Sequence, residues 1–518
     1  MFIRNLINIF LCETRRHAGE GDLQDVENVA RGQGVRSDQH PVNNLFNWIS
    51  ASALASCVAL PPASMQSFAG MTGKHLVCTR FTQLCWLLML FISTTVHATP
   101  DIQHWQTEKG VRVYFVEAHE LPMVDVQVLF DAGSGRDGDK PGLAVLTNGL
   151  LSEGADGLNA DEISQNFENL GANFGSSTSA DTASVSLRVL NEADKLEPAI
   201  ANLKRVITKP DFPADAFERN RNLTLTGIRQ KQQSPSALAK DAFYAAIYGD
   251  HPYAVPQEGT EVSLQSITIK DLKGFHNQYY VASNAMVAIV GDLTRKQAEQ
   301  VVIDLMDGLE TGKRAEPLGE VKPLESASVV RVEHPSTQTH ILVGQPGIKR
   351  TDPDLFPLYV GNHVLGGGGM VSRLFEEIRE KRGLSYSTYS YFLPMKQWGP
   401  FVAGLQTRTD QAEDALALLF EQLSSFVETG PTEAELEAAK QNLTGGFALR
   451  IDSNSDILNY LAMIGFNELP LDYLDVYNEK IMSVTSEQIK DAFRRKLSTD
   501  KMATVMVGPK PESDKSNE

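Results

Sequence analysis

The sequence predicts an α+β fold made of two homologous domains, each a mostly antiparallel sheet with helices packed on one side. Three observations support this prediction. The order of elements in the first half of the chain recurs in the second half, both halves contain strands of alternating apolar residues, and both end with a capped helix followed by a strand. Between the halves, residues 313–325 are rich in Gly, Pro and charge and are predicted to link residues 99–312 to residues 326–510.

Each element predicted in the first half has a counterpart in the second. A strand of period two comes first, and the chain then passes through a glycine-rich turn into a helix. A second strand precedes an amphipathic helix, and a helix with a capping box, opened by Thr268 with Asp271 or by Thr485 with Gln488, precedes the last strand. The predicted strands are residues 124–130, 184–190 and 286–292 in the first half and residues 339–344, 401–407 and 502–508 in the second, and the amphipathic helices are residues 191–207 and 410–427.

Residues 71–98 are predicted to be a secretory signal peptide. Basic residues precede an apolar run at residues 84–92, which is too short to span a bilayer, and small residues fit cleavage after Ala98. The sequence therefore predicts a periplasmic or secreted mature chain with no membrane span, and an uncleaved signal anchor is the alternative. Residues 1–70 have no sustained period and are predicted to be a disordered extension or the result of a mis-assigned start.

Charge and cysteine content exclude several functions. The formal net charge of −18 argues against nucleic-acid binding and favours basic or neutral peptides if the chain binds peptides. A mature chain that begins after Ala98 has no thiol, which excludes disulfides, cysteine-bound metals and a cysteine nucleophile. The polar residues 511–518 are predicted to be disordered. The four cysteines are Cys12, Cys57, Cys78 and Cys85.

The stretch from residue 361 to residue 386 is the most informative part of the chain. In it, Arg379 belongs to a predicted helix at residues 371–381 and precedes Tyr386 by seven positions, and Gly383 is suited to end that helix. Tyr386 is expected in a strand at residues 385–392. A run of four glycines before the helix predicts a mobile or closely approached loop. These glycines are Gly366, Gly367, Gly368 and Gly369.

This combination resembles the C-terminal half of the pitrilysin/insulinase family of zinc peptidases, and among them the mitochondrial processing peptidase. The resemblance covers residues 101–510 and implies that the two domains form a clamshell around a chamber. It also implies that Arg379 and Tyr386 hold a substrate backbone, and that the glycine run takes part in substrate handling, although this run is shorter than in the processing peptidase. On the residues alone, Arg379 could instead pair locally with Glu376 or Glu380, and Tyr386 could lie in the core.

The inverted zinc motif that the resemblance implies, H-x-x-E-H, is missing. Val145, Asn148 and Gly149 stand where its two histidines and its glutamate belong. The third metal ligand, a Glu roughly seventy-five residues further on, falls at Leu225, and no carboxylate occurs between Glu218 and Asp241.

No other catalytic pattern replaces the missing one. No two histidines of the mature chain have the spacing that places both on one helix face, and the glycine run lacks the Lys-Ser/Thr of a phosphate-binding loop. The sequence therefore predicts no catalytic residue, no metal and no cofactor.

The resemblance implies a non-catalytic, substrate-binding subunit of a two-chain peptidase. Its partner would be a paralogue that carries H-x-x-E-H, the two would form a heterodimer, and its ligand would be a peptide. A scaffold or peptide-binding module without a proteolytic partner is the alternative. A lone peptidase with an unrecognised metal site is disfavoured by the missing ligands.

Overall fold

Two sheets, one in each half of the chain, organise the residues that the computed structural model describes, which are 99–510. The predicted signal peptide, N-terminal extension and C-terminal tail lie outside these residues. Within the described part, no helix is both long and apolar enough to cross a lipid bilayer. Residues 311–324, which include most of the predicted linker, contain no helix or strand.

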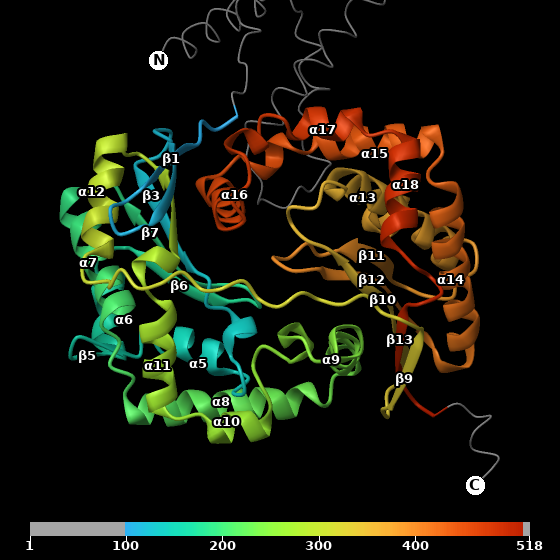
Figure 1. Cartoon of the computed structure of the whole chain (residues 1–518), viewed down its shortest axis with the longest axis horizontal. Coiled ribbons are helices and arrows are strands. Elements are labelled where there is room, and N and C mark those ends of the chain that lie inside the picture. The colour runs from blue at the N-terminus through green and yellow to red at the C-terminus, as the bar shows by residue number, and fades with distance from the viewer. Residues whose placement is uncertain (1–98, 511–518) are drawn as a thin grey trace, which may run out of the picture. The chain divides into compact units, whose positions relative to one another are not determined.

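The two sheets, which Figure 1 shows apart from each other, share an order of five strands, and the first sheet has β1 in addition. The first contains β1 (Gln103–Gln106), β2 (Arg112–Glu117), β3 (Met123–Phe130), β6 (Asn173–Thr178), β7 (Ala183–Leu190) and β8 (Ala285–Gly291), and the second contains β9 (Ser328–Glu333), β10 (Gln338–Ile348), β11 (Thr388–Phe392), β12 (Gly399–Arg408) and β13 (Ala503–Gly508). Their orders are β1-β2-β8-β3-β7-β6 and β11-β12-β10-β13-β9. Read from β9, the second order matches β2-β8-β3-β7-β6, so β3 corresponds to β10 and β6 to β11.

The antiparallel character of both sheets is confirmed. In each sheet only one neighbouring pair is parallel, β2 with β8 and β13 with β9, and these pairs occupy corresponding places. The six strands predicted from the sequence are β3, β7, β8, β10, β12 and β13, with bounds that agree within a few residues.

The helices follow the predicted order. Thr268 and Thr485 cap α11 and α18 through the predicted capping boxes, in which each threonine side chain accepts from the backbone N–H three residues later. The longer helices of the first half are α5 (Leu143–Gly149), α6 (Ala160–Glu168), α7 (Ala193–Thr208), α8 (Ala214–Lys231), α9 (Pro235–Tyr248), α10 (Glu261–Ser266), α11 (Ile269–Tyr279) and α12 (Arg295–Met306). Those of the second half are α13 (Leu355–Asn362), α14 (Ala412–Thr429), α15 (Glu433–Gly445), α16 (Asn454–Phe466), α17 (Tyr477–Ser483) and α18 (Ser486–Lys496).

The two halves exchange one helix each. α16, from the second half, packs against β2, β3 and β8 of the first sheet, while α9, from the first half, packs against β10 and β13 of the second (Figure 1). Each sheet therefore has a helix of the other half on one face in addition to the helices of its own half.

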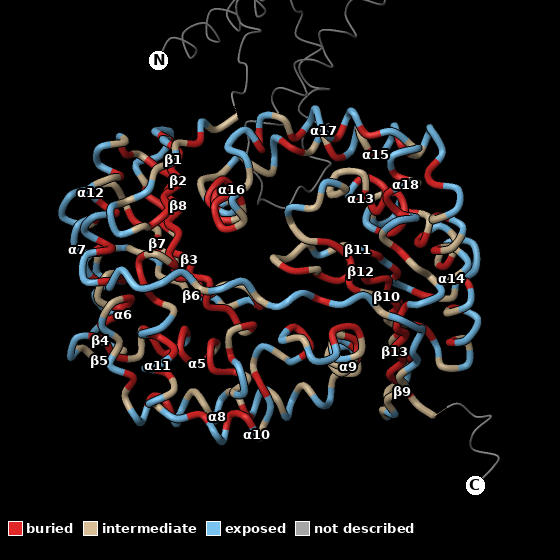
Figure 2. Tube along the Cα trace, in the orientation of Figure 1, coloured by how far each residue is buried: buried red, intermediate tan, exposed pale blue. Residues whose placement is uncertain are grey.

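The burial of β8 is a consequence of this exchange. Its residues are all buried (Figure 2), and successive side chains belong to two different cores. Val287 and Ile289 pack with the helices of the first half, whereas Met286 and Ala288 share a cluster with Leu461 of α16. A strand covered on both faces is apolar throughout, which explains the sequence AMVAIVG.

Two local predictions around Arg379 need correction. The helix expected at residues 371–381 has a π-helical part, η6 (Phe375–Glu380), in which the Lys381 N–H donates to the carbonyl of Glu376, five residues earlier. The strand expected from residue 385 begins at Thr388, so Tyr386 precedes it. The hydroxyl oxygen of Ser385 lies 2.7 Å from the carbonyl oxygens of both Ser387 and Gln406, which share its single proton, and this local side-chain bonding occurs where regular strand pairing is absent.

Candidate functional site

An asparagine, Asn148, occupies the position of the missing general base and forms hydrogen bonds inside the first half. Asn148 lies on α5, is 2% exposed, and donates from Nδ2 to the carbonyls of Ser177 on β6, at 2.8 Å, and Ser184 on β7, at 3.2 Å. The hydroxyl of Tyr280 donates to its Oδ1 at 3.0 Å. All three contacts are internal, so Asn148 ties the helix to the sheet and has no free polar edge for a ligand.

The remaining metal-ligand positions cannot hold zinc. Leu225 on α8 is buried in the apolar core of the first half, Val145 is an aliphatic side chain, and Gly149 is an exposed glycine at the end of α5. Zinc in proteins requires thiolate, imidazole or carboxylate donors. Within residues 99–510 no group of three such side chains is placed to hold a metal ion. The residues at this place do not fit the metal that the fold family implies.

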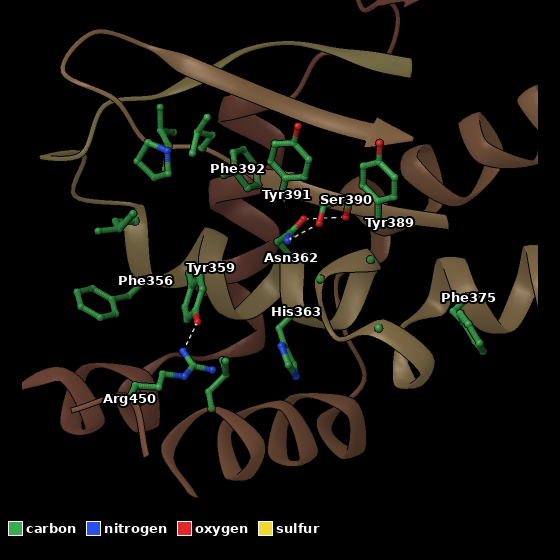
Figure 3. A pocket seen from close by; sticks show the side chains of 18 of the residues that line it. Phe356, Tyr359, Asn362, His363, Phe375, Tyr389, Ser390, Tyr391, Phe392 and Arg450 are labelled. Atoms are coloured by element: carbon green, nitrogen blue, oxygen red, sulfur yellow. Dashed lines mark hydrogen bonds between the residues drawn. The ribbon is translucent and has the colours of Figure 1, made fainter. Parts of the chain in front are cut away.

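The second half contains a cavity of about 820 Å³ that brings together most of the predicted binding residues. Arg379, Tyr386 and three of the four glycines line it, and Gly368 does not. Its walls come from α13, from the turn after α13, from β11 and from the segment that includes α15, α16 and α17 (Figure 3). The residues predicted from the sequence are therefore neighbours around one concave surface.

Arg379 is held by aromatic rings. Its guanidinium carbon lies 4.6 Å from the ring centre of Phe375 and 4.6 Å from that of Tyr386. Its nearest carboxylate, that of the exposed Glu380, is 3.9 Å from Nε, which makes a weak ion pair. Tyr386 is 73% exposed and is not a core residue. These cation–π contacts hold the guanidinium beside the two rings without using its N–H groups in a strong ion pair, so these groups can donate to other acceptors.

Close packing within the chain explains most of the glycine run. A Cβ at Gly366 would lie 2.5 Å from the backbone nitrogen of Ser390, one at Gly367 would lie 2.6 Å from Nδ2 of Asn362, and one at Gly368 would lie 2.7 Å from a backbone oxygen. Gly369 has open space but a φ of +62°. The run begins in a π-helical turn, η4 (His363–Gly367), and such turns are frequent at functional sites. The loop is thus closely approached, as predicted, but by its own chain.

Several cavity residues were not predicted from the sequence. Arg350, Tyr359, His363 and Arg450 all line the cavity, together with an aromatic wall of Phe356, Tyr473 and Tyr477. Arg450 donates to the hydroxyl of Tyr359 at 2.9 Å, as Figure 3 shows. These residues come from two stretches of the chain, 350–363 and 450–477, which are separated by more than eighty residues and follow no motif, so only the fold brings them together.

The helix start behind the glycine run is fixed by an ion pair. Arg373 contacts Glu435 on α15 with Nε to Oε1 at 2.5 Å and Nη2 to Oε2 at 2.6 Å. Burial of Glu435 opposes its ionisation, but hydrogen bonds from Arg373 and Thr432 outweigh this effect and hold its pKa at about 2. This bidentate pair anchors the segment that carries Arg379 to the rest of the second half.

Comparison with known proteins identifies the family. The family model described as "Insulinase (Peptidase family M16)" matches residues 112–261, and the one described as "Peptidase M16 inactive domain" matches residues 266–443. A protein of Helicobacter pylori named "Non-peptidase homolog YmxG" is 30% identical over 406 residues, which cover 77% of this chain and 92% of that protein. The chain belongs to peptidase family M16, the insulinase family. The resemblance on which the sequence predictions rest is thereby confirmed.

Further family M16 relatives agree in fold and extent. The crystal structure of a peptidase M16 inactive domain from Pseudomonas fluorescens has a TM-score of 0.77 at 42% identity and covers 79% of this chain and 98% of that one. The "Uncharacterized zinc protease YmxG" of Bacillus subtilis is 24% identical over 412 residues, covering 79% of this chain and 98% of that protein. With its ligand set missing, this M16 chain is a non-catalytic member of the family, and the predicted fold class is confirmed.

Proposed function

We propose that this chain is the non-catalytic, substrate-binding subunit of a periplasmic two-chain zinc peptidase, whose partner carries H-x-x-E-H. One observation carries the proposal: the first half lacks the metal-binding side chains, whereas the second half has a cavity lined by the predicted binding residues. The first half has filled its metal-ligand positions with an aliphatic side chain, a glycine and a hydrogen-bonded asparagine. The second half keeps Arg379 and Tyr386 together on an 820 Å³ cavity. A chain that has lost its chemistry but retains a lined binding cavity is suited to holding substrate for another chain.

The role proposed for Arg379 and Tyr386 is to grip backbone carbonyls of an extended peptide. Both side chains donate hydrogen bonds, and the guanidinium remains charged at any working pH. Because Arg379 lies against two rings and is only weakly paired with Glu380, a bound carbonyl would not have to displace a strong partner. The proposed periplasmic location rests on the segment 71–98 and is tested by N-terminal sequencing of the protein recovered from the periplasmic fraction.

Reconstitution with the paralogue tests this function. Mixing the purified chain with an H-x-x-E-H paralogue from the same genome should give chelator-sensitive cleavage of a quenched peptide that neither chain gives alone. Activity of this chain by itself, or no gain on mixing with any such paralogue, would contradict the proposal and favour a scaffold without proteolytic partner.

Substitution of the gripping pair gives the largest predicted effect on activity. Arg379→Ala or Tyr386→Phe should lower kcat/KM of the mixed complex roughly fivefold to a hundredfold, because each removes one hydrogen bond worth about 1 to 3 kcal/mol. Arg379→Lys should also be impaired, since an ammonium lacks the planar fork. Arg408→Ala is the matched control, because Arg408 is an exposed arginine that pairs with Asp410 and does not line the cavity. Full activity of the Arg379→Ala, Tyr386→Phe double variant would refute the gripping role.

A further inference from the structure

The 820 Å³ cavity has a charge opposite to that of the chain as a whole. Its lining includes three arginines, Arg350, Arg379 and Arg450, and contains no Asp or Glu. The chain carries a formal net charge of −18, with 65 acidic and 47 basic residues. A concave surface of one charge sign raises the local concentration of ligands of the opposite sign. The local charge therefore favours an anionic ligand, whereas the net charge of the whole chain favours basic or neutral peptides.

Arg350 is the cavity arginine with the least internal compensation. Among the described residues its side chain makes no ion pair and no hydrogen bond, although its backbone N–H donates to the carbonyl of Met395 at 2.8 Å. It is mostly buried, and burial lowers the pKa of this guanidinium. Arg373, a half-buried arginine of the same half, is paired instead: it contacts Glu435 at 2.5 Å. A buried guanidinium without an anion is costly and gains most from an anionic ligand.

Two further donors lie on the same cavity. Arg450 donates to the hydroxyl of Tyr359 and has no carboxylate partner among the described residues. The Nε2 atom of His363 is buried and has no hydrogen-bond partner in the same set. Burial, and then the charge of Arg450, lowers the pKa of His363, so the imidazole is neutral and can present one N–H. Figure 3 shows His363 beside the Arg450–Tyr359 pair.

An aromatic wall adjoins these donors. The ring of Phe356 is 6.1 Å from that of Tyr473 and 5.9 Å from that of Tyr477, and all three residues line the cavity. Such a wall accepts an apolar side chain, while a guanidinium fork accepts the two oxygens of a carboxylate. The cavity therefore combines the two features by which a peptide end or an acidic residue with an apolar neighbour is recognised.

We propose that this cavity binds a peptide carboxylate through Arg350 and Arg450, with a neighbouring apolar side chain against Phe356, Tyr473 and Tyr477. The carboxylate is either the C-terminus of the peptide or the side chain of an Asp or Glu. This inference rests on the proposed peptide-binding function and specifies its substrate class. It assigns Arg350 and Arg450 a role separate from that of Arg379, which grips the backbone.

Isothermal titration calorimetry with three unlabelled peptides tests the inference on the chain as recovered from the cell, without a partner. All three are alanine-based nonapeptides containing one Phe. The first has Gln beside Phe and a free C-terminus, the second has Glu beside Phe and an amidated C-terminus, and the third has Gln and an amidated C-terminus and so carries no carboxylate. We expect one of the first two peptides to bind tightly, and the third peptide to bind at least tenfold more weakly than that one. Tight binding of the first identifies a C-terminal carboxylate, and tight binding of the second identifies an acidic side chain.

Arginine variants separate this site from general electrostatic attraction. Arg350→Gln and Arg450→Gln should each weaken the favoured peptide at least fivefold and leave the carboxylate-free peptide unchanged. Arg408→Gln, an exposed arginine outside the cavity, should change neither. A melting curve checks folding; if Arg350→Gln fails to fold, Arg450→Gln carries the test. Equal affinity for all three peptides, or equal weakening by Arg408→Gln, would overturn the inference.

The outcome is distinguishable from failure of the proposed function. If mixing with the H-x-x-E-H paralogue gives no activity but the three peptides still bind differently, the carboxylate site stands and the subunit role fails. If the mixed complex is active but cleaves acidic and carboxylate-free peptides with equal kcat/KM and this chain binds them equally, the carboxylate site alone fails.

Discussion

The helix after the central strand differs between the two halves, although its framework is the same. α5 comes after β3 and carries the buried Asn148, and α13 comes after β10 and carries the buried Asn362. Asn148 bonds to β6 and β7, and Asn362 donates to the Ser390 carbonyl on β11, the counterpart of β6, at 3.0 Å and accepts from its hydroxyl at 2.7 Å. The same residue type thus ties the same helix to the same edge of both sheets.

The segment after the asparagine separates the two halves. After Asn148 the chain passes Gly149 into Leu150 and Leu151, both fully buried. After Asn362 it turns through η4 into the glycine run and borders the cavity. This fold can therefore close the place where the family's metal would sit and leave the corresponding place in the other half open. The cavity that bears the proposed binding residues accordingly lies in the second half.

Replacing the two asparagines should show which half depends more on internal hydrogen bonds. Asn148→Ala leaves the buried Ser184 carbonyl and the buried Tyr280 hydroxyl without this partner, also removes the bond to the exposed Ser177, and should destabilise the chain by about 3 kcal/mol. Asn362→Ala leaves only Ser390 groups beside a cavity that water can enter, and should cost about 1 to 2 kcal/mol. Thermal unfolding of both variants gives the order. A larger loss for Asn362→Ala would mean that the cavity side is the more tightly closed one.

Local signals in the sequence predicted much of the fold. The capping boxes at Thr268 and Thr485 depend on residues three apart, and the strands depend on alternation within a few positions. No local pattern in the sequence indicated that α9 and α16 would each pack against the sheet of the other half. The apolar face of α9, with Phe243 and Ile247, would suit either sheet, and only long-range packing against Ala503 and its neighbours decides which one it covers.

The glycine run, which follows Asn362 in the second half and is absent after Asn148 in the first, is predicted to depend on close packing. Gly366→Ala would place a Cβ 2.5 Å from both the backbone nitrogen and the hydroxyl of Ser390. Backbone cannot yield cheaply, so this overpacking should cost about 1 to 3 kcal/mol. A drop in melting temperature of the purified variant, with weaker peptide binding, is the expected result. An unchanged melting temperature would show that the loop moves freely and is not held against β11.

The site was predicted in part, for a physical reason. Arg379 and Tyr386 are seven positions apart along one segment, so the sequence could single them out together, and the Arg379 guanidinium carbon does lie 4.6 Å from the centre of the Tyr386 ring. Arg350, His363 and Arg450 lie on three separate segments and come to line the same cavity only after the second half folds. The structural role of Asn148 was equally hidden, because its partners Ser177, Ser184 and Tyr280 are 29, 36 and 132 residues away.

The ion pair behind the glycine run should make the second half sensitive to acid. The pKa of Glu435 is held at about 2, below its ordinary value of 4.5, so its stabilising contribution is complete above about pH 4.5 and is lost as the pH falls towards 2. Glu435→Gln keeps the capping acceptor for Thr432 but removes the charge. It should lower stability by about 1 kcal/mol at pH 7, since the pair is partly solvated.

Melting temperatures at pH 7, 4 and 3 test this linkage. The difference between the native chain and Glu435→Gln should narrow as the pH falls. A difference that stays constant across this range would show that the carboxylate contributes through packing and not through its charge.

The smallest expected effect concerns Gly149, which stands at a metal-ligand position of the family. It ends α5, is exposed, has no positive φ, and a Cβ built on it meets no atom within 4 Å. Gly149→Ala should therefore raise stability by about 0.5 to 1 kcal/mol, because alanine loses less backbone entropy in a helix. Gly383→Ala is the matched control: it has equally open space but a φ of +61°, and should lower stability by about 1 kcal/mol. Thermal unfolding of both variants gives the two signs. If Gly149→Ala destabilises the chain instead, another group must pack against the end of α5. The space at the former metal-ligand position would then be occupied, contrary to the open surroundings of Gly149 in this structure.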